Sequence, residues 1–445
     1  MPYHSPSPLP TEPIIKINPV LDFIGDTAFV AVKMPGDAGS FSREHLAVIT
    51  SKRELFFWNE ESLFEAGITA DCERPRLLEP RWSSQSIREF QSGAETPTTT
   101  VIHQSIRAYL QKYLGLRHPA EYDLLALWIM GTYLKPLFKC YPILFFNAPY
   151  ESGKSRCLEA VSQLSFNGKW FGEISPAAFR RYSAEIKPTF CLDELQEVSL
   201  KNHSTMIAIL LNAYNSSETM LAGFNHRSGW QPEAFKVTSP VALGNTEDIK
   251  NKALQSRTIT IRTEYDSRFK NINLPGADHP EPSKIRDGLY GWFLGNWQSV
   301  REHYQNYPVV PVLSAREIDS YKPLLALAAL AGPEVEKALT GYTAAVRARN
   351  LMVKNAFDDR YELLAFLKQE LDARSPGEAF PAITNKALTD AYNNQNRLRL
   401  NYRRFLEMVN ALQVVKDIKN YSGSKCLVLN RAEIERQLDV YMTKG

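Results

Sequence analysis

The chain has 445 residues, of which 44% are hydrophobic and 23% charged, and its formal net charge is +3 at pH 7. This length predicts about three domains of ~150 residues each, in an ordinary globular protein. The near-neutral charge excludes a uniformly basic surface, so any affinity for nucleic acid must come from local patches. The apolar runs are too short to span a bilayer and the N-terminus lacks a signal-peptide pattern. We therefore expect a cytoplasmic protein without a membrane partner.

The order of patterns along the chain predicts an α/β fold. Residues 1–13 are polar and proline-rich and are expected to form a flexible N-terminus. Residues 14–99 alternate short apolar runs with Gly, Pro, Asp and Ser, which predicts a small α+β N-terminal domain. Its last helix is expected to start at a serine cap in SSQSIREFQSG. Residues 100–270 alternate helical patterns with apolar runs typical of a parallel sheet, namely YPILFFN, TFCLDE, PVALGN and RTITIRT.

The remaining residues are predicted to be mostly helical. Residues 271–350 have helical spacing throughout, and we expect them to form a helical lid on the α/β domain. Residues 351–445 combine helices with two short β runs around NYSGS. Helices followed by a terminal hairpin indicate a C-terminal winged-helix-like domain.

A nucleotide site is indicated where the first apolar run ends. Residues 145–155 read FFNAPYESGKS and continue into the helical pattern RCLEAVSQLS. A phosphate loop needs consecutive backbone N–H groups, a helix N-terminus and a lysine. Gly153 would let the backbone approach the phosphates, Lys154 would reach their β and γ oxygens, and Ser155 would hold Mg²⁺. A chance Gly-Lys-Ser is the alternative, which the flanking strand and helix patterns disfavour.

Two residues of this loop depart from the usual phosphate-loop pattern. Alanine stands at position 148, where such loops begin with glycine, and it can serve there if its φ is negative. Glu151 is an anion beside the expected phosphates, and the pattern offers no role for it. The residues expected to bind the nucleotide from this loop are Ala148, Pro149, Ser152, Gly153, Lys154 and Ser155.

The next three strands carry polar residues at their ends. TFCLDE places Asp193 and Glu194 after a buried strand, where such a pair would coordinate Mg²⁺ through water and orient the attacking water; a solvated turn is the alternative. PVALGN places Asn245 at a strand tip, where a side chain would lie near the γ-phosphate and the lytic water. Arg257 precedes the fourth strand. It could neutralise transition-state charge at a neighbour's nucleotide, and a surface salt bridge is an equally good interpretation.

The motif order APYESGKS, TFCLDE, PVALGN and LQSRTITI resembles the ATPase core of AAA+ proteins. More narrowly, it is similar to the superfamily 3 and minichromosome-maintenance-like helicase ATPases of phages, plasmids and genomic islands, often found within primase-helicases. The resemblance covers about residues 100 to 345 and includes WIMGTYL and ISPAAFRRYSAEIKPTFCLDE. It implies ATP and Mg²⁺ as cofactors, DNA as a partner, and a homo-oligomer, usually a hexameric ring, with the active site between subunits. It also makes Arg316, in SAREIDSYKPLLALAALAG, the candidate second sensor from the lid.

A hairpin is predicted just before the strand that ends at Asn245. TMLAGF and EAFKV could pair as strands around the tip NHRSGW. The resembled helicases carry a hairpin at this place whose basic tip lines the ring channel. His226 and Arg227 would then contact the DNA backbone and Trp230 could stack on a base. An ordinary exposed hairpin is the alternative. NAYNSSETM stands where the resembled helicases commonly show an Arg-Gly pair, so this segment departs from the family pattern.

A second basic cluster lies in the C-terminal segment. Arg403 and Arg404 begin an apolar helical pattern, with tyrosines interleaved between the basic residues, and are further candidate DNA contacts. Winged-helix domains bind DNA or mediate protein contacts about equally often, so this cluster alone does not decide between the two.

Together these observations favour an ATP-dependent DNA motor, a ring-forming replicative helicase of a mobile genetic element. No primase-like catalytic cluster is evident, so priming would need a separate primase or other replication protein. The alternative is an ATP-switched DNA-binding initiator or assembly ATPase without processive unwinding. A monomeric small-molecule P-loop kinase is disfavoured, because it would need neither the sensor asparagine, nor an arginine offered in trans, nor a hairpin insert.

Overall fold

The chain forms two compact units, Met1–Gly341 and Tyr342–Gly445, in the computed structural model. The division falls inside helix α11 (Pro333–Ala356), and the predicted domain boundaries stay predictions. Among the helices that the structure describes, none has both the length and the apolar character needed to cross a membrane. The described residues are 15–34, 45–148, 152–195, 205–215, 220–225, 231–263, 266–269, 272–308, 310–311, 313–356, 359–396, 399–421 and 424–443.

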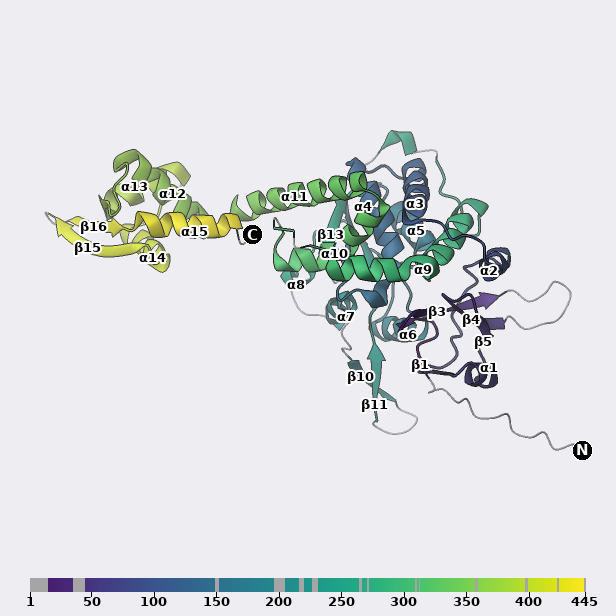
Figure 1. The fold of residues 1–445 in the computed structure, drawn as a ribbon. Coiled ribbons are helices and arrows are strands. Elements are labelled where there is room, and N and C mark those ends of the chain that lie inside the picture. The colour runs from purple at the N-terminus through teal and green to yellow at the C-terminus, as the bar shows by residue number, and fades with distance from the viewer. Residues whose placement is uncertain are drawn as a thin grey trace, which may run out of the picture. The chain divides into compact units, whose positions relative to one another are not determined.

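A five-stranded parallel sheet lies at the centre of the first unit (Figure 1), with the strand order β13-β7-β12-β9-β8. All neighbouring strands are parallel, so their carboxyl ends share one edge. The four predicted strands are confirmed, whereas the short edge strand β8 was not predicted. The strands are β7 (Ile143–Asn147), β8 (Lys169–Phe171), β9 (Phe190–Asp193), β12 (Val241–Asn245) and β13 (Thr258–Arg262).

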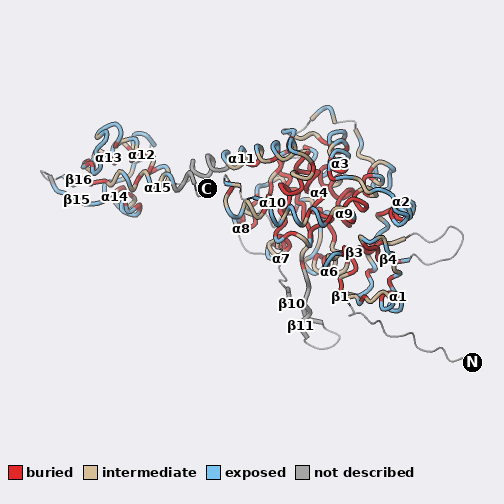
Figure 2. Tube along the Cα trace, in the orientation of Figure 1, coloured by how far each residue is buried: buried red, intermediate tan, exposed pale blue. Residues whose placement is uncertain are grey.

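Helices cover both faces of this sheet, which explains why its central strands read as continuous apolar runs. On one face, α5 (Lys154–Leu164) packs against the central strands. On the other face, α6 (Pro176–Ile186) and α7 (Thr205–Tyr214) share one apolar core with strand residues such as Phe145 and Leu243. Buried residues are concentrated in these layers (Figure 2). The predicted α/β fold with a parallel sheet is therefore confirmed.

The helices that precede the first strand of the parallel sheet in the sequence pack against helices that follow its last strand. Helix α4 (Pro119–Thr132) is buried along almost its whole length, as its continuous apolar pattern requires. It contacts α3 (Thr99–Tyr113) and α10 (Ala315–Ala331), and α3 also contacts α9 (Pro280–Asn306). The helices predicted as a lid are thus built into the first unit through α3 and α4.

The N-terminal part of the first unit contains two small sheets. One is the parallel pair of β1 (Ile15–Ile17) and β6 (Ile68–Ala70). The predicted serine cap is confirmed, since the Ser83 side chain accepts a hydrogen bond at the start of α2 (Ser84–Gln91). The antiparallel sheet and the two helices of this part are β2 (Leu21–Ile24), β3 (Thr27–Met34), β4 (His45–Thr50), β5 (Leu55–Phe57), α1 (Glu60–Glu65) and α2 (Ser84–Gln91).

The second unit has its own apolar core around Leu367, Phe405 and Leu427. Its antiparallel sheet has the order β14-β16-β15, and β15 and β16 form the predicted hairpin. The hairpin is not terminal as predicted, because helix α15 (Arg431–Thr443) follows it. The order of elements is compatible with a winged-helix-like domain, which stays a prediction. The elements are α12 (Asp359–Arg374), β14 (Ala382–Thr384), α13 (Asn385–Asn396), α14 (Tyr402–Ala411), β15 (Val415–Tyr421), β16 (Ser424–Leu429) and α15 (Arg431–Thr443).

Candidate nucleotide site

Four adjacent strands bring polar residues to the carboxyl edge of the parallel sheet. In the strand register, Arg262 lies beside Asn147, and Asn147 lies beside Asn245. Asp193 ends β9, the next strand along. The loop that follows β7 leaves from the same edge and leads to Lys154. The structure therefore gathers Lys154, Asp193 and Asn245, which the sequence predicted as one site.

The loop after β7 turns into helix α5 at Gly153. Gly153 has a φ of 85°, a conformation that favours glycine. It is also the N-cap and has no side chain, so it leaves the first N–H groups of α5 uncapped for an anionic ligand. Ala148 is buried and its φ is not positive, so the backbone there does not require glycine. Pro149 and Glu151 lie outside the described residues.

Lys154 lies across this loop. Its side chain is buried, and Nζ donates a hydrogen bond of 2.9 Å to the carbonyl of Ala148. Ser152 is also buried, and its hydroxyl lies 3.5 Å from Oγ1 of Thr263, just after β13. Ser155 is exposed in the first turn of α5. A lysine, a hydroxyl and a helix N-terminus at one turn are the groups that bind nucleotide phosphates.

Asp193 presents a buried carboxylate oxygen to this edge. Its Oδ1 accepts no hydrogen bond from the residues that the structure describes. A buried carboxylate oxygen costs free energy unless a cation or water satisfies it. A Cβ at position 244 would lie 3.1 Å from this oxygen and 2.8 Å from Cδ1 of Leu158, so Gly244 makes room for both. Carboxylate and hydroxyl oxygens suit Mg²⁺, so Asp193 and Ser155 are a compatible ligand set.

Glu194 follows with a backbone conformation that is unusual for a non-glycine residue. Its φ is 53°, in the left-handed region, which costs roughly 1–2 kcal/mol for a side chain other than glycine. Its N–H donates to the carbonyl of Gly244 at 2.8 Å, which fixes this conformation, and its side chain is exposed. Backbone strain of this kind concentrates at functional sites, which supports a role for Glu194 beyond a solvated turn.

Asn245 is buried, and its amide binds backbone groups on both sides. Nδ2 donates to the carbonyl of Leu195 at 3.3 Å, and Oδ1 accepts from the N–H of Thr246 at 2.8 Å. The bond to Leu195 connects the end of β12 to the residue that follows Glu194. The amide therefore holds the acidic segment in place, in addition to the sensor role that the sequence predicted.

Asn147 and Arg262 are two residues of this edge that the sequence interpretation missed. Nη1 of Arg262 donates to Oδ1 of Asn147 at 3.1 Å, and Nη2 forms an ion pair with Asp248 at 3.3 Å. Nδ2 of Asn147 contacts the carbonyl of Asn245 at 3.4 Å. RTITIRT begins with one arginine and carries a second at its sixth position, and in a parallel sheet the second one must lie at the carboxyl edge. That signal was available in the sequence.

Arg257 lies at the opposite, amino end of β13. The five residues of β13, at about 3.3 Å each, put roughly 17 Å between the two ends of the strand. Nη1 donates to the carbonyl of Ala253 at 2.7 Å, and the guanidinium lies 5.6 Å from the centre of the Tyr214 ring. From this position Arg257 does not reach the phosphate loop of its own chain.

Arg316 lies near Arg257, at the edge of the sheet where β13 begins. Its Nη1 donates to Oγ of Ser256, the residue before Arg257, at 3.1 Å. A second contact joins helix α10 to this region, because the hydroxyls of Ser320 and Tyr214 lie 3.1 Å apart. The structure thus separates Arg316 from Lys154 of the same chain. A contact of Arg316 with nucleotide would have to be made in a neighbouring subunit.

The predicted hairpin is confirmed in its backbone pairing. Strands β10 (Met220–Asn225) and β11 (Gln231–Lys236) are antiparallel, and Asn225 pairs with Gln231. The tip residues His226, Arg227 and Trp230 lie outside the described residues.

In the second unit, Arg403 and Arg404 are exposed in the first turn of α14. Both form ion pairs with Glu407, at 3.5 and 3.3 Å. Two guanidinium groups share one carboxylate, so the turn keeps a net positive charge.

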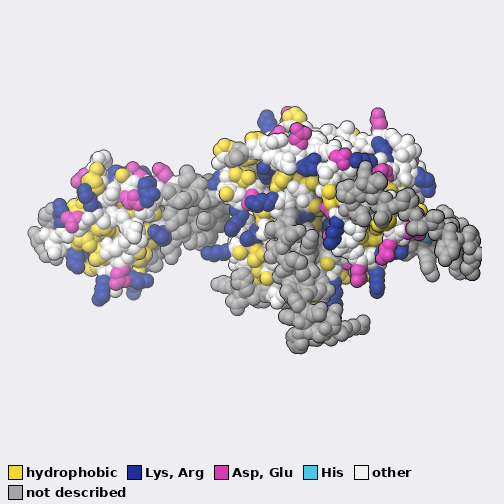
Figure 3. Space-filling view, turned by 60° about the horizontal axis from the view of Figure 1, so that its bottom comes forward, with side chains coloured by type: hydrophobic (Ala, Val, Ile, Leu, Met, Phe, Trp, Pro, Cys, Tyr) yellow, Lys and Arg dark blue, Asp and Glu magenta, His cyan; other side chains and the backbone are white. Residues whose placement is uncertain are grey.

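Figure 3 shows Lys and Arg side chains interspersed with acidic and apolar ones on the visible face, which fits local rather than extended contacts with an anion.

Comparisons with known proteins give the following likenesses. No protein-family model and no curated protein matches the chain. Among solved structures, the apo C-terminal region of NrS-1 is 10% identical, with a TM-score of 0.40, over 90% of this chain and 97% of that one. The active helicase Cch of SCCmec type IV is 9% identical, with a TM-score of 0.38, over 83% of this chain and 74% of that one.

A full-length MCM homologue from Methanopyrus kandleri is 12% identical, with a TM-score of 0.36, over 71% of this chain and 76% of that one. A helicase and an MCM homologue are thus among the solved structures that this chain resembles.

Proposed function

We propose that this protein is an ATP-dependent DNA motor, a ring-forming replicative helicase of a mobile genetic element. The observation that carries the proposal is that the predicted catalytic residues lie at two opposite edges of the parallel sheet. Lys154 and Asp193 share the carboxyl edge of the sheet, whereas Arg257 lies at the far end of β13. A nucleotide bound at Lys154 could meet an Arg257 only if a second subunit supplied it. A kinase acting as a monomer would have no use for this arrangement.

Within one subunit, the residues of the carboxyl edge would bind ATP and position water. Lys154 would leave the Ala148 carbonyl for the β and γ oxygens, and Ser155 and Asp193 would hold Mg²⁺. When bound, Mg²⁺ neutralises charge that develops on the phosphates. Glu194 would orient the attacking water, and its exposed side chain leaves it accessible to a nucleotide. Through its bond to Leu195, Asn245 would hold Asp193 and Glu194 in place beside the loop after β7.

The neighbouring subunit would complete the site with its Arg257. An arginine of this kind stabilises transition-state charge and is worth ~10³-fold or more in rate. Tyr214 and Ala253 hold its guanidinium, and Arg316 on the same side would add a second cation. ATP binding would then strengthen the subunit interface and hydrolysis would weaken it, which is the cycle that a ring motor requires.

DNA would be bound by the hairpin tip and by the second unit. His226 and Arg227 suit a phosphate backbone, and Trp230 suits stacking on a base. These assignments follow from the family resemblance and from the position of the hairpin before β12. Arg403 and Arg404 would add contacts from α14, because their charge exceeds that of Glu407.

Release of a labelled strand from a forked DNA duplex tests the proposal. The wild-type protein with ATP and Mg²⁺ should release free single strands, whereas Glu194→Gln should bind ATP and the fork without releasing a strand. Replacing His226 and Arg227 with alanine should preserve ATP hydrolysis and abolish strand release. ATP hydrolysis without any strand release by the wild-type protein would reject the motor and favour the ATP-switched initiator.

A further inference from the structure

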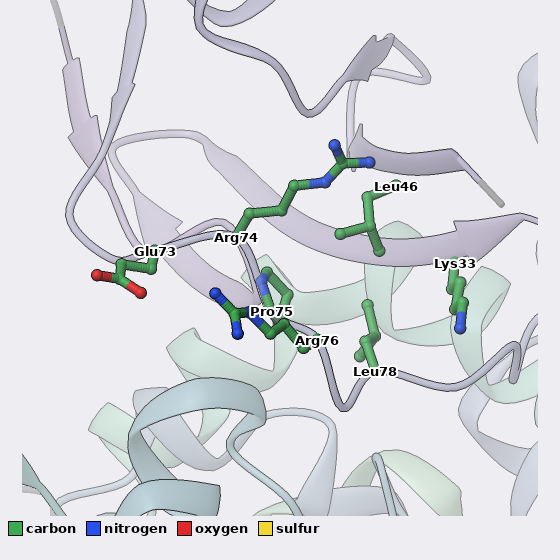
Figure 4. A pocket seen from close by; sticks show the side chains of 7 residues that line it. All are labelled: Lys33, Leu46, Glu73, Arg74, Pro75, Arg76 and Leu78. Atoms are coloured by element: carbon green, nitrogen blue, oxygen red, sulfur yellow. The ribbon is translucent and has the colours of Figure 1, made fainter. Parts of the chain in front are cut away.

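A cavity of about 450 Å³ lies in the N-terminal part of the first unit (Figure 4). None of the residues that line it belongs to the parallel sheet or to the loop that leads to Lys154. Lys33 on β3 and Leu46 on β4 line one part of it. The rest is lined by the segment that runs from the small sheets toward α2, through Glu73, Arg74, Pro75, Arg76 and Leu78. Cavities of this size accommodate small ligands or one unit of a polymer.

The lining is positively charged. It has three cations, Lys33, Arg74 and Arg76, and one carboxylate, Glu73, which gives a net charge of +2 (three minus one). Arg74 and Arg76 are exposed, and neither forms an ion pair within the part of the chain that the structure describes. Figure 4 shows the two guanidinium groups leaving the segment in different directions. Two such groups near one cavity favour an anion, because guanidinium binds phosphate with paired hydrogen bonds.

The same cavity has an apolar part. Leu46, Pro75 and Leu78 are buried, and all three line it. In Figure 4 the side chains of Leu46 and Leu78 approach one another from the strand and from the segment. A bare inorganic anion would gain nothing from these side chains. A ligand with both a phosphate and an apolar face, such as a sugar with its base, would use both parts of the lining.

The segment that carries the two arginines is hydrogen-bonded to α6 and to the C-terminal end of α5, two helices that cover the parallel sheet. The N–H groups of Arg76 and Leu77 donate to Oε1 of Glu185 on α6, at 2.5 and 2.9 Å. Arg81, a few residues later, donates to four carbonyls at the C-terminal end of α5, those of Ser162, Gln163, Ser165 and Gly168. Helix α5 begins with Lys154, so a ligand in the cavity would contact a segment that is fixed to the nucleotide-binding helix.

We propose that this cavity binds a phosphorylated nucleoside unit, with Arg74 or Arg76 on its phosphate and Leu46 and Leu78 against the sugar and base. The unit is either part of a single-stranded nucleic acid or a free nucleotide, and both share the same chemistry. This inference goes beyond the proposed motor and does not depend on ATP hydrolysis.

The test uses the full chain carrying Lys154→Ala, so that the loop after β7 does not bind the probe, and no ATP is added. Binding of a fluorescent oligothymidylate is measured by anisotropy at several salt concentrations, and binding of thymidine monophosphate by calorimetry. Arg74→Ala with Arg76→Ala is compared with Arg88→Ala, an exposed arginine on α2, and with Arg74→Lys plus Arg76→Lys. Thermal unfolding of each variant shows whether it is folded.

For a strand, we expect the double alanine variant to bind oligothymidylate about tenfold more weakly. The log–log slope of its affinity against salt concentration should become shallower by roughly 0.7 for each phosphate that the variant no longer binds. Arg88→Ala should bind normally and the lysine variant should keep most of the affinity. Loss of thymidine monophosphate binding alone would identify a free nucleotide as the ligand. Unchanged binding of both probes by a folded double alanine variant would overturn the proposal, whether or not the protein is a motor.

Discussion

The ammonium of Lys154 donates a hydrogen bond of 2.9 Å to the carbonyl of Ala148, across the loop that joins β7 to α5. The bond shows that the loop brings its lysine back over its own first residue, as a phosphate cradle does. It involves the backbone at position 148, so the side chain there can be alanine.

The first prediction separates these two residues. Lys154→Ala should abolish ATP hydrolysis, because it removes the ammonium that lies across this loop. Ala148→Gly should keep ATP affinity within about twofold, since φ at this position is already accessible to both residues. Equilibrium binding of a fluorescent ATP analogue and steady-state phosphate release check both variants. A large gain in affinity for Ala148→Gly would mean that the alanine impairs the loop.

The second prediction concerns Gly244. Gly244→Ala would place a Cβ 2.8 Å from Leu158 Cδ1 and 3.1 Å from Asp193 Oδ1, so α5 and the carboxylate would have to shift. We expect the free energy of unfolding to fall by about 1–3 kcal/mol and a higher Mg²⁺ concentration to be needed for half-maximal hydrolysis. Gly172→Ala is the matched control, because a Cβ there meets nothing within 4 Å. Equal effects of the two substitutions in chemical denaturation would contradict this account of Gly244.

The third prediction is a pH dependence of stability at Lys135, which is buried in the short helix η1 (Lys135–Leu137). Burial lowers the pKa of Lys135 from 10.5 to about 7. Between these values the unfolded chain binds a proton that the native chain has released. The free energy of unfolding therefore rises with pH above about 7, by up to about 1.4 kcal/mol per pH unit. Below pH 7 both states are protonated and the full cost of burying the charge is present.

Chemical denaturation between pH 7 and 8.5 measures this slope. Lys135→Met should show a smaller rise than the wild type over this range, because the titrating group is gone. Buried thiols change stability in the opposite direction at higher pH. Burial raises the pKa of Cys157 from 9.0 to about 12. The free energy of unfolding therefore falls as the pH rises above about 9, where the thiol of the unfolded chain ionises and that of the native chain does not. Identical slopes for the wild type and Lys135→Met would exclude Lys135 as the source.

The fourth prediction assigns Tyr214 to the positioning of Arg257. The guanidinium lies 5.6 Å from the ring centre, and the ring hydroxyl contacts Ser320 of α10 at 3.1 Å. Tyr214→Phe keeps the ring and should keep most of the hydrolysis rate, whereas Tyr214→Leu should lower kcat by ~10-fold with ATP affinity unchanged. The separation of kcat from affinity distinguishes a positioning role from a general loss of structure. Equal kcat for the leucine and phenylalanine variants would reject the role of the ring.

Much of the sheet could be predicted because its strands are buried on both faces. YPILFFN and PVALGN read as continuous apolar runs for this reason, and a polar residue at the end of such a run marks the carboxyl edge. Strand β8 could not be predicted in this way. It has only three residues, of which Trp170 is exposed and Lys169 partly exposed. Its sequence therefore contains no apolar run from which a strand could be predicted.

The site was predicted less completely, because tertiary contacts decide what each polar residue does. Arg257 was identified by its place before a strand, while Arg262, at the other end of the same strand, was missed although it contacts Asn147. The buried amide of Asn245 binds Leu195, a contact between segments that sequence spacing does not reveal. The proximity of Arg316 to Arg257 likewise depends on a tertiary contact, the hydrogen bond from Arg316 on α10 to Ser256, which follows α8 (Lys252–Gln255).

The central claim is that one subunit supplies Lys154 and the next supplies Arg257. The measurement that tests it most directly is DNA-stimulated ATP hydrolysis by mixtures of Lys154→Ala and Arg257→Ala proteins. Each variant alone should be inactive. A random equal mixture should recover activity at about a quarter of its interfaces, where an intact loop meets an intact arginine. No recovery in mixtures that do assemble together would contradict a site shared between subunits.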